Sequence, residues 1–250
     1  MFSNIIEFQT LKEFIENNKD NHPIPTKVNI PEWYKKLKHY PNSKTIKGCM
    51  PFLDTLTTGY LLKLDQDIYL EHNIEVDGEK TSTSLPAIVQ STQNTKYAHT
   101  INLNYKPLME EAHPQGQIGE CPYGEKNKNF PIMKIHNPWC IKTPPGYSCL
   151  FLPPLNNEDD RFSIIPGIVD TDTYDNEVNF PFVVNGDKYP ELKTTLKRGT
   201  PYVQVIPFKR EKWKMKIVEK KEPFNDRLFF YFKLIKDNYK NRHWKKKQWK

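Results

Sequence analysis

Short runs of alternating apolar and polar residues fill the middle of the chain and predict β-strands. From residue 60 onward, Tyr60, Leu62 and Leu64 alternate with Lys63 and Asp65, and a further apolar run covers 68–70. Such alternation places one set of side chains on one face of a strand. Later candidates, each bounded by turns rich in Pro, Gly or Asn, are residues 139–142, 148–152, 162–169, 177–184 and 202–208. Short strands between turns are typical of a mainly β protein, here a β-sandwich or a jelly-roll-like β-clip.

Helical spacing occurs only towards the two ends of the chain. Residues 10–18 begin with the capping-box spacing of Thr10 and Glu13, and Pro31 opens a second short helix over 29–37. Near the other end, Asn225 is a typical helix N-cap. The apolar residues that recur behind it at helical spacing are Leu228, Phe232, Ile235 and Tyr239. We therefore predict short N-terminal helices and a C-terminal amphipathic basic helix.

These patterns divide the chain into three regions. Residues 1–45 would form a helical arm, 46–221 a single β-rich domain and 222–250 the basic, aromatic C-terminal helix. Within the domain, residues 107–138 carry Pro and Gly throughout, which predicts one long loop. The chain has 21 prolines against 10 glycines. Because proline interrupts long helices and central strands, this excludes a helical bundle, a coiled coil and an ordinary doubly wound α/β enzyme.

Positive charge is concentrated at the C-terminal end. Residues 209–250 hold 16 Lys and Arg against 5 Asp and Glu, a net charge of +11, whereas the rest of the chain holds 21 against 25 and is at −4. A basic tail on a mildly acidic body predicts binding to a polyanion, a membrane surface or an acidic protein. A merely solvated helix face is the alternative.

Two tryptophans lie among the last basic residues and add a second kind of contact. Aromatic rings between lysines can stack on nucleic-acid bases, sit at a membrane interface or pack against a neighbouring subunit. We predict a protein partner or self-association, with nucleic acid as a further possibility. The candidate binding residues are Lys240, Arg242, Trp244, Lys245, Lys246, Lys247 and Trp249.

The chain carries no membrane or export signal in its residue pattern. No apolar run approaches the roughly 18 residues of a membrane-spanning helix, and no basic stretch followed by an apolar one predicts a secretory signal. We expect the protein in the cytoplasm of a host cell or associated with a virion.

Most sequence signatures of catalysis and metal binding are missing. The chain has no phosphate-binding GxxxxGK[ST] loop, no GxGxxG, no GxSxG and no His-x-Asp or His-x-Glu that would begin an iron-binding triad. Two imidazoles and two thiols in or beside the long loop could still hold a tetrahedral zinc ion, although their spacing follows no common pattern. These candidate metal ligands are His113, Cys121, His136 and Cys140. No cofactor is otherwise predicted, and magnesium enters only with the enzyme hypothesis below.

The most specific stretch runs from residue 139 to residue 210. It contains Pro144-Pro145-Gly146-Tyr147, then Gly167-Ile168-Val169-Asp170, and finally Lys197-Arg198-Gly199-Thr200-Pro201-Tyr202-Val203-Gln204-Val205. This order of a Pro-Gly turn, a Gly-apolar-apolar-Asp hairpin and a Lys-x-Gly strand with a Gln resembles deoxyuridine triphosphatases and deoxycytidine triphosphate deaminases, which share the β-clip fold. The resemblance covers about 70 of the 250 residues.

The resemblance implies a water-activating aspartate and a sugar-stacking aromatic residue. Asp170 and Tyr174 match those positions, with a separation one residue longer than usual, and Asp172 is a rival for the aspartate. The Arg-Ser-Gly phosphate-binding motif of those enzymes is replaced by the acidic stretch 153–160, which would repel a triphosphate. The Gly-rich phosphate-covering tail is replaced by the Lys/Trp helix. Turn formation at a hairpin is the alternative role of both aspartates.

A second resemblance covers most of the chain. The Pro-Pro-Gly-Tyr block at 144–147, Gly-Ile-Val-Asp-Thr-Asp at 167–172 and Asn-Phe-Pro-Phe at 179–182 look like an uncharacterised family of tailed-phage proteins, especially from marine cyanobacterial phages, with some bacterial members. Residues 30–35 and 45–69 are similar to that group too. This implies a phage or bacterial origin but no activity.

Two functional hypotheses follow from these patterns. In the first, the protein is a non-enzymatic β-rich module that binds or assembles through its C-terminal helix. In the second, it is a divergent nucleotide-processing or other small-molecule enzyme, similar to deoxyuridine triphosphatase, that uses Asp170 or Asp172 as a base beside Tyr174 and Arg161. The second requires these four side chains to meet in one pocket.

Overall fold

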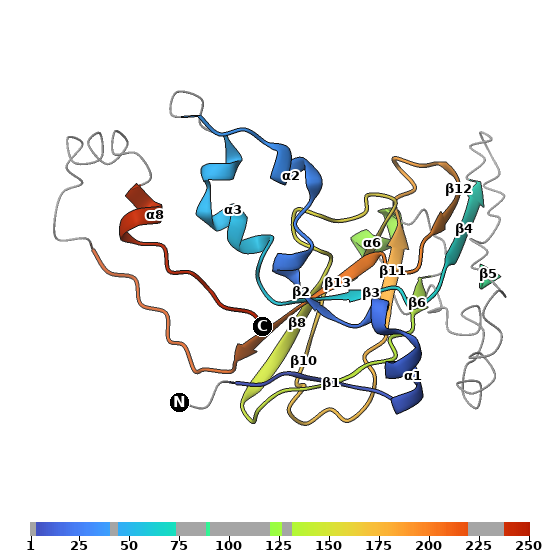
Figure 1. Cartoon of the computed structure of the whole chain (residues 1–250), viewed down its shortest axis with the longest axis horizontal. Coiled ribbons are helices and arrows are strands. Elements are labelled where there is room, and N and C mark those ends of the chain that lie inside the picture. The colour runs from blue at the N-terminus through green and yellow to red at the C-terminus, as the bar shows by residue number, and fades with distance from the viewer. Residues whose placement is uncertain (1–3, 41–44, 74–88, 91–120, 127–131, 220–237) are drawn as a thin grey trace.

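The computed structural model describes residues 4–40, 45–73, 89–90, 121–126, 132–219 and 238–250, and these form a mainly β protein (Figure 1). Within these ranges all strand pairs are antiparallel and belong to four sheets. The largest sheet has the order β10-β8-β13-β3-β2. Its strands are β2 (Ile24–Pro25), β3 (Tyr60–Lys63), β8 (Tyr147–Leu152), β10 (Gly167–Val169) and β13 (Pro201–Lys209).

The other sheets are smaller and contribute to the same core. One pairs β1 (Glu7–Gln9) with β7 (Cys140–Lys142). Two three-stranded sheets have the orders β6-β11-β9 and β12-β4-β5. Their strands are β4 (Ile68–Asn73), β5 (Val89–Gln90), β6 (Met133–Ile135), β9 (Phe162–Ile164), β11 (Phe180–Val184) and β12 (Glu191–Leu196).

The helices among the described residues are short. They are α1 (Lys12–Asn17), α2 (Glu32–Lys36), α3 (Met50–Thr55), α6 (Pro122–Lys126) and α8 (Asn238–Arg242), with 3₁₀ turns η1 (Lys19–Asn21), η2 (Thr26–Val28) and η3 (Ile46–Gly48). None of these helices is long and apolar enough to cross a membrane. Helix α1 follows the predicted 10–18 segment, but it begins after Leu11 and no side chain caps it.

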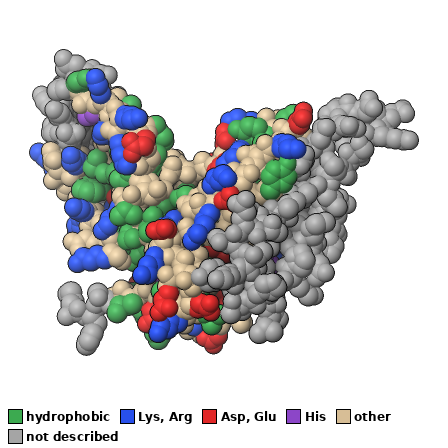
Figure 2. All heavy atoms as spheres, turned by 45° about the vertical axis from the view of Figure 1, so that its right-hand side comes forward, with side chains coloured by type: hydrophobic (Ala, Val, Ile, Leu, Met, Phe, Trp, Pro, Cys, Tyr) green, Lys and Arg blue, Asp and Glu red, His purple; other side chains and the backbone are tan. Residues whose placement is uncertain are grey.

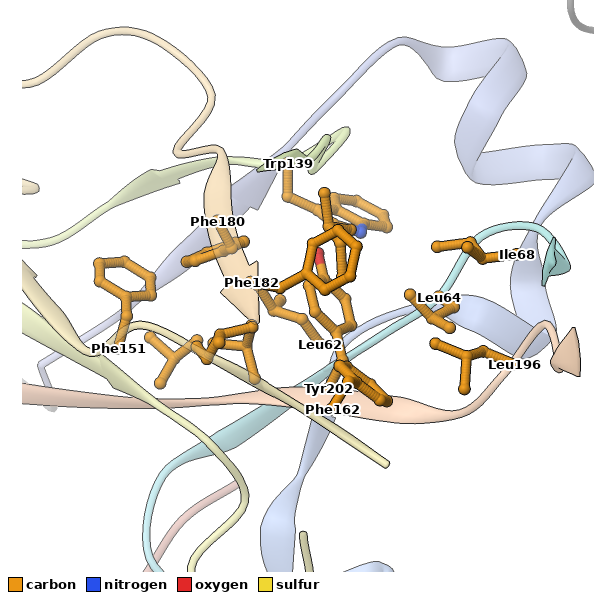
Figure 3. Packing of buried hydrophobic residues seen from close by; sticks show 14 of the residues in the cluster. Leu62, Leu64, Ile68, Trp139, Phe151, Phe162, Phe180, Phe182, Leu196 and Tyr202 are labelled. Atoms are coloured by element: carbon orange, nitrogen blue, oxygen red, sulfur yellow. The ribbon is translucent and has the colours of Figure 1, made fainter. Parts of the chain in front are cut away.

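One aromatic-rich core joins strands from all four sheets (Figure 3). Phe180 of β11 lies between Phe151 of β8 and Tyr202 of β13, with ring centroids 5.4 and 5.7 Å away. Phe14 attaches α1 to this core by an edge contact with Trp139, centroid to centroid 5.7 Å. The 13% aromatic content therefore compensates for a low overall share of apolar residues.

A buried glutamine holds three segments together at the centre of the large sheet. Gln204 of β13 is fully buried. Its amide nitrogen donates to the carbonyls of Thr55 and Thr58, at 3.1 and 2.7 Å, and its amide oxygen accepts from the backbone N–H of Leu155 at 2.8 Å. Both amide hydrogens and the amide oxygen are used internally, so in this chain the conspicuous Gln of the last strand joins α3 and the segment after β8 to β13.

Several predicted boundaries need correction. The predicted strand over 162–169 is two strands, β9 and β10, because Pro166 cannot donate to a continuous ladder. The predicted loop 107–138 contains α6 and β6 in its described part. The predicted C-terminal helix does not continue to residue 250, since α8 ends at Arg242 and residues 244–250 have no regular secondary structure. The helix start predicted at Asn225 lies outside the described residues.

Candidate functional site

A tight turn before β8 positions the first half of the candidate aspartate site. Pro145 and Gly146 are the central residues of this turn, which is closed by a 3.2 Å hydrogen bond from Tyr147 N–H to the carbonyl of Pro144. Gly146 has a φ of +83°, which glycine adopts without strain at this position of a type II turn. The turn leaves the backbone N–H of Gly146 free to donate 2.8 Å to a carboxylate oxygen of Asp172.

Arg210 binds Asp172 through two parallel contacts and completes this site from the end of β13. Its Nη1 donates to Oδ1 of Asp172 at 2.9 Å, and its Nη2 contacts Oδ2. Nη1 also reaches the hydroxyl of Ser148 at 2.9 Å and the carbonyl of Tyr147 at 2.8 Å. This arginine lowers the pKa of Asp172 to about 2, with the Gly146 N–H as a second cause. Asp172 is therefore a permanently charged anchor and a poor proton acceptor near neutral pH.

Asp170 lies in the same cluster but faces solvent. Its side chain is 61% exposed, against 7% for Asp172. Oδ1 of Asp170 accepts from the hydroxyl of Ser148 at 2.6 Å and lies 3.2 Å from Nη1 of Arg210. The two aspartates thus share one arginine, and Asp170 is the one with an accessible carboxylate.

The structure brings together only part of the predicted catalytic set. Tyr174 belongs to the turn that follows Asp170. Its N–H donates to the carbonyl of Asp170 at 3.0 Å, and the residue is 41% exposed. Arg161 lies elsewhere, where it forms a bidentate pair with Asp159 and donates 2.6 Å to the hydroxyl of Thr194. These contacts engage the guanidinium of Arg161 at a place other than Asp170 and Asp172. Asp170, Asp172 and Tyr174 are therefore neighbours, and Arg161 serves another site.

The predicted binding residues of the tail lie in a segment that returns to the body. In Figure 1 the chain passes through α8 and then runs back, so that its end lies beside β2. The indole N–H of Trp244 is 3.1 Å from both carboxylate oxygens of Asp54 in α3, and Lys247 pairs with the same carboxylate. Trp249 packs edge-on against Tyr60 of β3, with centroids 5.9 Å apart. Two aromatic anchors and one lysine therefore fix this segment.

The remaining basic side chains of the segment stay exposed. Lys240, Arg242, Lys245 and Lys246 are all exposed, and none of them forms an ion pair with another residue in the described part of the chain. Figure 2 shows Lys and Arg side chains interleaved with hydrophobic ones down its left-hand side, while Asp and Glu gather at the lower edge. The exposure of these four side chains and the contacts of Trp244 and Trp249 with the body show that the anchored segment presents positive charge outward and its indole rings inward.

A pocket opens where the returning segment meets the N-terminal strand. It has a volume of about 830 Å³, and Phe8, Tyr60, Tyr147, Trp249 and several prolines line it. The indole N–H of Trp249 is buried without a hydrogen-bond partner among the described residues. The walls of the pocket are therefore chiefly aromatic and apolar, unlike the charged surface around Asp170.

The candidate zinc ligands are described only in part. His113 lies outside the described residues. Cys140 begins β7, and its backbone forms an isolated antiparallel β-bridge with Glu177. Burial raises the pKa of the Cys140 thiol, which disfavours the thiolate that binds zinc. Within the described ranges, no three His, Cys, Asp or Glu side chains gather as a metal-binding group. The zinc site of His113, Cys121, His136 and Cys140 stays a prediction.

Two residues central to these sites were not predicted. Nothing in the residue pattern singles out Arg210, although a cation at the end of the last long strand is a natural partner for the acidic turn 170–172. Asp54 carries no motif at all, and only the fold reveals it as the acceptor for Trp244. No known protein family matches this chain, and no curated protein sequence matches it significantly.

Proposed function

We propose that this protein is a non-enzymatic β-rich binding or assembly module, of phage or bacterial origin, that contacts an acidic partner or a polyanion through residues 238–250. The observation that carries the proposal is the anchored tail: Trp244 and Trp249 hold the segment on the body, while Lys240, Arg242, Lys245 and Lys246 point their charge to solvent. The finer fold proposal, a β-clip or jelly-roll-like sandwich, is supported by the Pro-Gly turn that precedes β8 and by the Asp-containing turn after β10, although β10 pairs with β8 and forms no hairpin with the next strand.

The anchoring makes the segment a better binding surface than a free tail. A mobile tail loses conformational entropy when it binds, and a segment already fixed at two points loses less. The charges of the segment also lie close together along a short stretch of chain, where a polyanion can meet several of them at once. Binding of this kind releases counterions, so its affinity falls steeply with salt.

Titration with polyanions tests this proposal directly. Fluorescently labelled single- and double-stranded DNA, about 20 nucleotides long, and poly-glutamate serve as probes, each measured over a range of salt concentrations. We expect binding that weakens with salt, and a fourfold Lys240/Arg242/Lys245/Lys246→Gln variant with a slope smaller by about 3–4 units for duplex DNA. A variant with Lys19, Lys27, Lys36 and Lys38 changed to Gln removes the same charge from other exposed positions and should keep the slope.

Two results would overturn the proposal. One is the absence of binding to any of these probes at low salt, and the other is an equal loss of binding in the two fourfold variants. The second result would mean that net charge, and no defined surface, governs the interaction. Preference for DNA over poly-glutamate would assign the partner to nucleic acid.

The enzyme hypothesis is the second candidate, and the exposed carboxylate of Asp170 is the observation that favours it. Asp170 accepts a hydrogen bond from Ser148 beside Arg210, so a water molecule could bind between the carboxylate and a substrate. Incubation with deoxynucleoside triphosphates and Mg²⁺, followed by phosphate and pyrophosphate assays, tests this role. Turnover that Asp170→Asn abolishes and Arg161→Gln retains would replace the binding proposal with the enzyme hypothesis.

A further inference from the structure

An extended arm leaves the body at the end of β13 and exposes a row of large apolar side chains. Residues 211–219 follow the 2.8 Å hydrogen bond from Arg210 N–H to the Gly146 carbonyl, and no backbone hydrogen bond joins them to another described residue. Trp213, Met215 and Ile217 are 88%, 85% and 88% exposed. Side chains two residues apart in an extended chain share a face, so this spacing would place these three apolar residues opposite Lys212, Lys214 and Lys216.

This arm has the properties of a β-strand without a sheet. Basic and apolar residues alternate from Lys212 to Ile217, the arm continues β13 directly, and its peptide groups have no backbone partner among the described residues. Single exposed apolar residues are common on protein surfaces. Three such side chains close together are unusual, and contiguous exposed apolar residues mark interaction sites. Such a segment binds by adding itself to the open edge of a sheet.

Pairing of two arms with each other is disfavoured by their charges. An antiparallel pair centred on Met215 would place Lys214 opposite Lys216 and Glu211 opposite Glu219. Like charges directly opposite each other destabilise a strand pair. The arm therefore fits an acidic sheet edge better than it fits a second arm.

Strand β10 forms an acidic sheet edge of this kind, and it lies close to Arg210, the residue after which the arm begins (the root of the arm). β10 is the last strand of the five-stranded sheet, and its Ile168 is 62% exposed. The exposed acidic residues that follow it are Asp170, which pairs with Arg210, Asp175, which pairs with Lys142, and Glu177. Arg210 contacts Asp170 at 3.2 Å, so arm root and edge are adjacent, yet in Figure 1 the arm runs outward from β13 and leaves its own β10 open.

We infer that two copies of this chain form a twofold symmetric dimer in which the arm 211–219 of each copy pairs with the β10 edge of the other. The apolar face of the arm would cover the exposed Ile168, and its lysines would lie near the acidic turn after β10. A reciprocal exchange of this kind uses the same contact twice and closes, so it produces a dimer and not a fibre. The inference concerns a different segment from the proposed function and does not require it.

Sedimentation of the whole 250-residue chain over a range of concentrations tests the dimer. We expect the wild type to sediment at twice the 29.6 kDa chain mass. Trp213→Ser combined with Ile217→Ser should weaken the dimer at least about 30-fold, since buried tryptophans dominate interface energies. Ile168→Lys should weaken it too, because it places a cation against the basic arm. Leu11→Ser combined with Val28→Ser removes two exposed apolar residues elsewhere and should leave the dimer intact.

A wild type that stays monomeric at the highest concentration, or a dimer that survives the arm substitutions, would overturn the inference. Monomers that bind anionic phospholipid vesicles through Trp213 would also overturn it and assign the arm to a membrane surface. Circular dichroism of each variant verifies that it folds. The fourfold variant of residues 240–246 should still dimerise and the arm variant should still bind polyanion, so the two proposals can fail independently.

Discussion

Two segments of similar composition, the arm 211–219 and the C-terminal segment 238–250, behave differently in this molecule. Both interleave lysine with tryptophan, yet Trp213 is in solvent while Trp244 donates to Asp54 and Trp249 packs on Tyr60. The difference lies in the body, which offers a carboxylate and an aromatic ring to one segment and no described partner to the other. The composition of a segment makes it amphipathic. Whether it packs on the body depends on partner residues there, such as Asp54 and Tyr60.

The C-terminal segment packs on Tyr60, and a substitution next to this residue should have the largest effect on stability. Gly59 precedes Tyr60 and has a φ of +71°, and a Cβ there would lie 2.1 Å from the carbonyl oxygen of Val205. We expect Gly59→Ala to destabilise the protein by about 2–4 kcal/mol, from backbone strain together with the clash. Gly146→Ala is the matched control, because Gly146 also has a positive φ but a Cβ there would meet no atom within 4 Å.

Urea unfolding measures both glycine variants. Gly146→Ala should cost only about 1 kcal/mol, the strain alone. Equal losses of stability in the two variants would mean that the clash between a Cβ at Gly59 and the Val205 carbonyl adds nothing to the cost of the substitution.

Removal of the carboxylate acceptor should release the C-terminal segment. Asp54→Ala leaves the indole N–H of Trp244 and the ammonium of Lys247 without their partner, and we expect a loss of about 1–2 kcal/mol. Limited trypsin digestion should cut faster after Lys245 and Lys246. Glu16→Ala breaks an exposed pair with Lys12 and should cost under about 0.5 kcal/mol, with unchanged cleavage. Unchanged cleavage in Asp54→Ala would contradict the anchor.

Substitution of the two tryptophans compares the segments directly. At concentrations where the protein is monomeric, Trp213→Ser should change the free energy of unfolding by less than about 0.5 kcal/mol, because no described residue buries its ring. Trp244→Ser should cost about 1–2 kcal/mol, since it removes a partly buried ring and a hydrogen bond. Thermal and urea unfolding measure both, and a larger loss for Trp213 would place the arm on its own body.

The β-strands were predictable because alternation and turn residues report local structure. The predicted strands at 148–152 and 202–208 became β8 and β13 with boundaries shifted by one residue. The run from Tyr60 became β3, although its neighbours Leu61 and Leu62 are both buried and do not alternate. β12 was missed because Glu191–Leu196 mixes charged residues and threonines, and its only fully buried residue is Leu196. α3 was missed because a proline stands at its first turn and its helical pattern is only six residues long.

The candidate site was predictable only as far as the hairpin motif reached. The motif indicated Asp170, Asp172 and Tyr174, which are neighbours along the chain. It could not indicate Arg210, which lies 38 residues away from Asp172 in sequence, because that contact depends on the pairing of β13 with β8. Arg161 was included because it lies near the motif in sequence, and the strands place it beside Asp159 and Thr194 instead.

Acid should loosen the root of the arm by weakening the pair between Asp172 and Arg210. Asp172 has a pKa of about 2 in the folded protein, below the roughly 3.9 of an unfolded aspartate. Its pair with Arg210 therefore stabilises the fold fully above about pH 4 and less and less as the pH falls towards 2. Asp172→Asn should remove this dependence, so urea midpoints at pH 5 and pH 2.5 should differ less in the variant than in the wild type. Asp170→Asn, at the exposed member of the cluster, serves as the control. An equal pH dependence in Asp172→Asn and wild type would mean that the ion pair with Arg210 does not fix the arm at its root. The arm would then lack this anchor at Arg210, whereas the C-terminal segment is held by Asp54 and Tyr60.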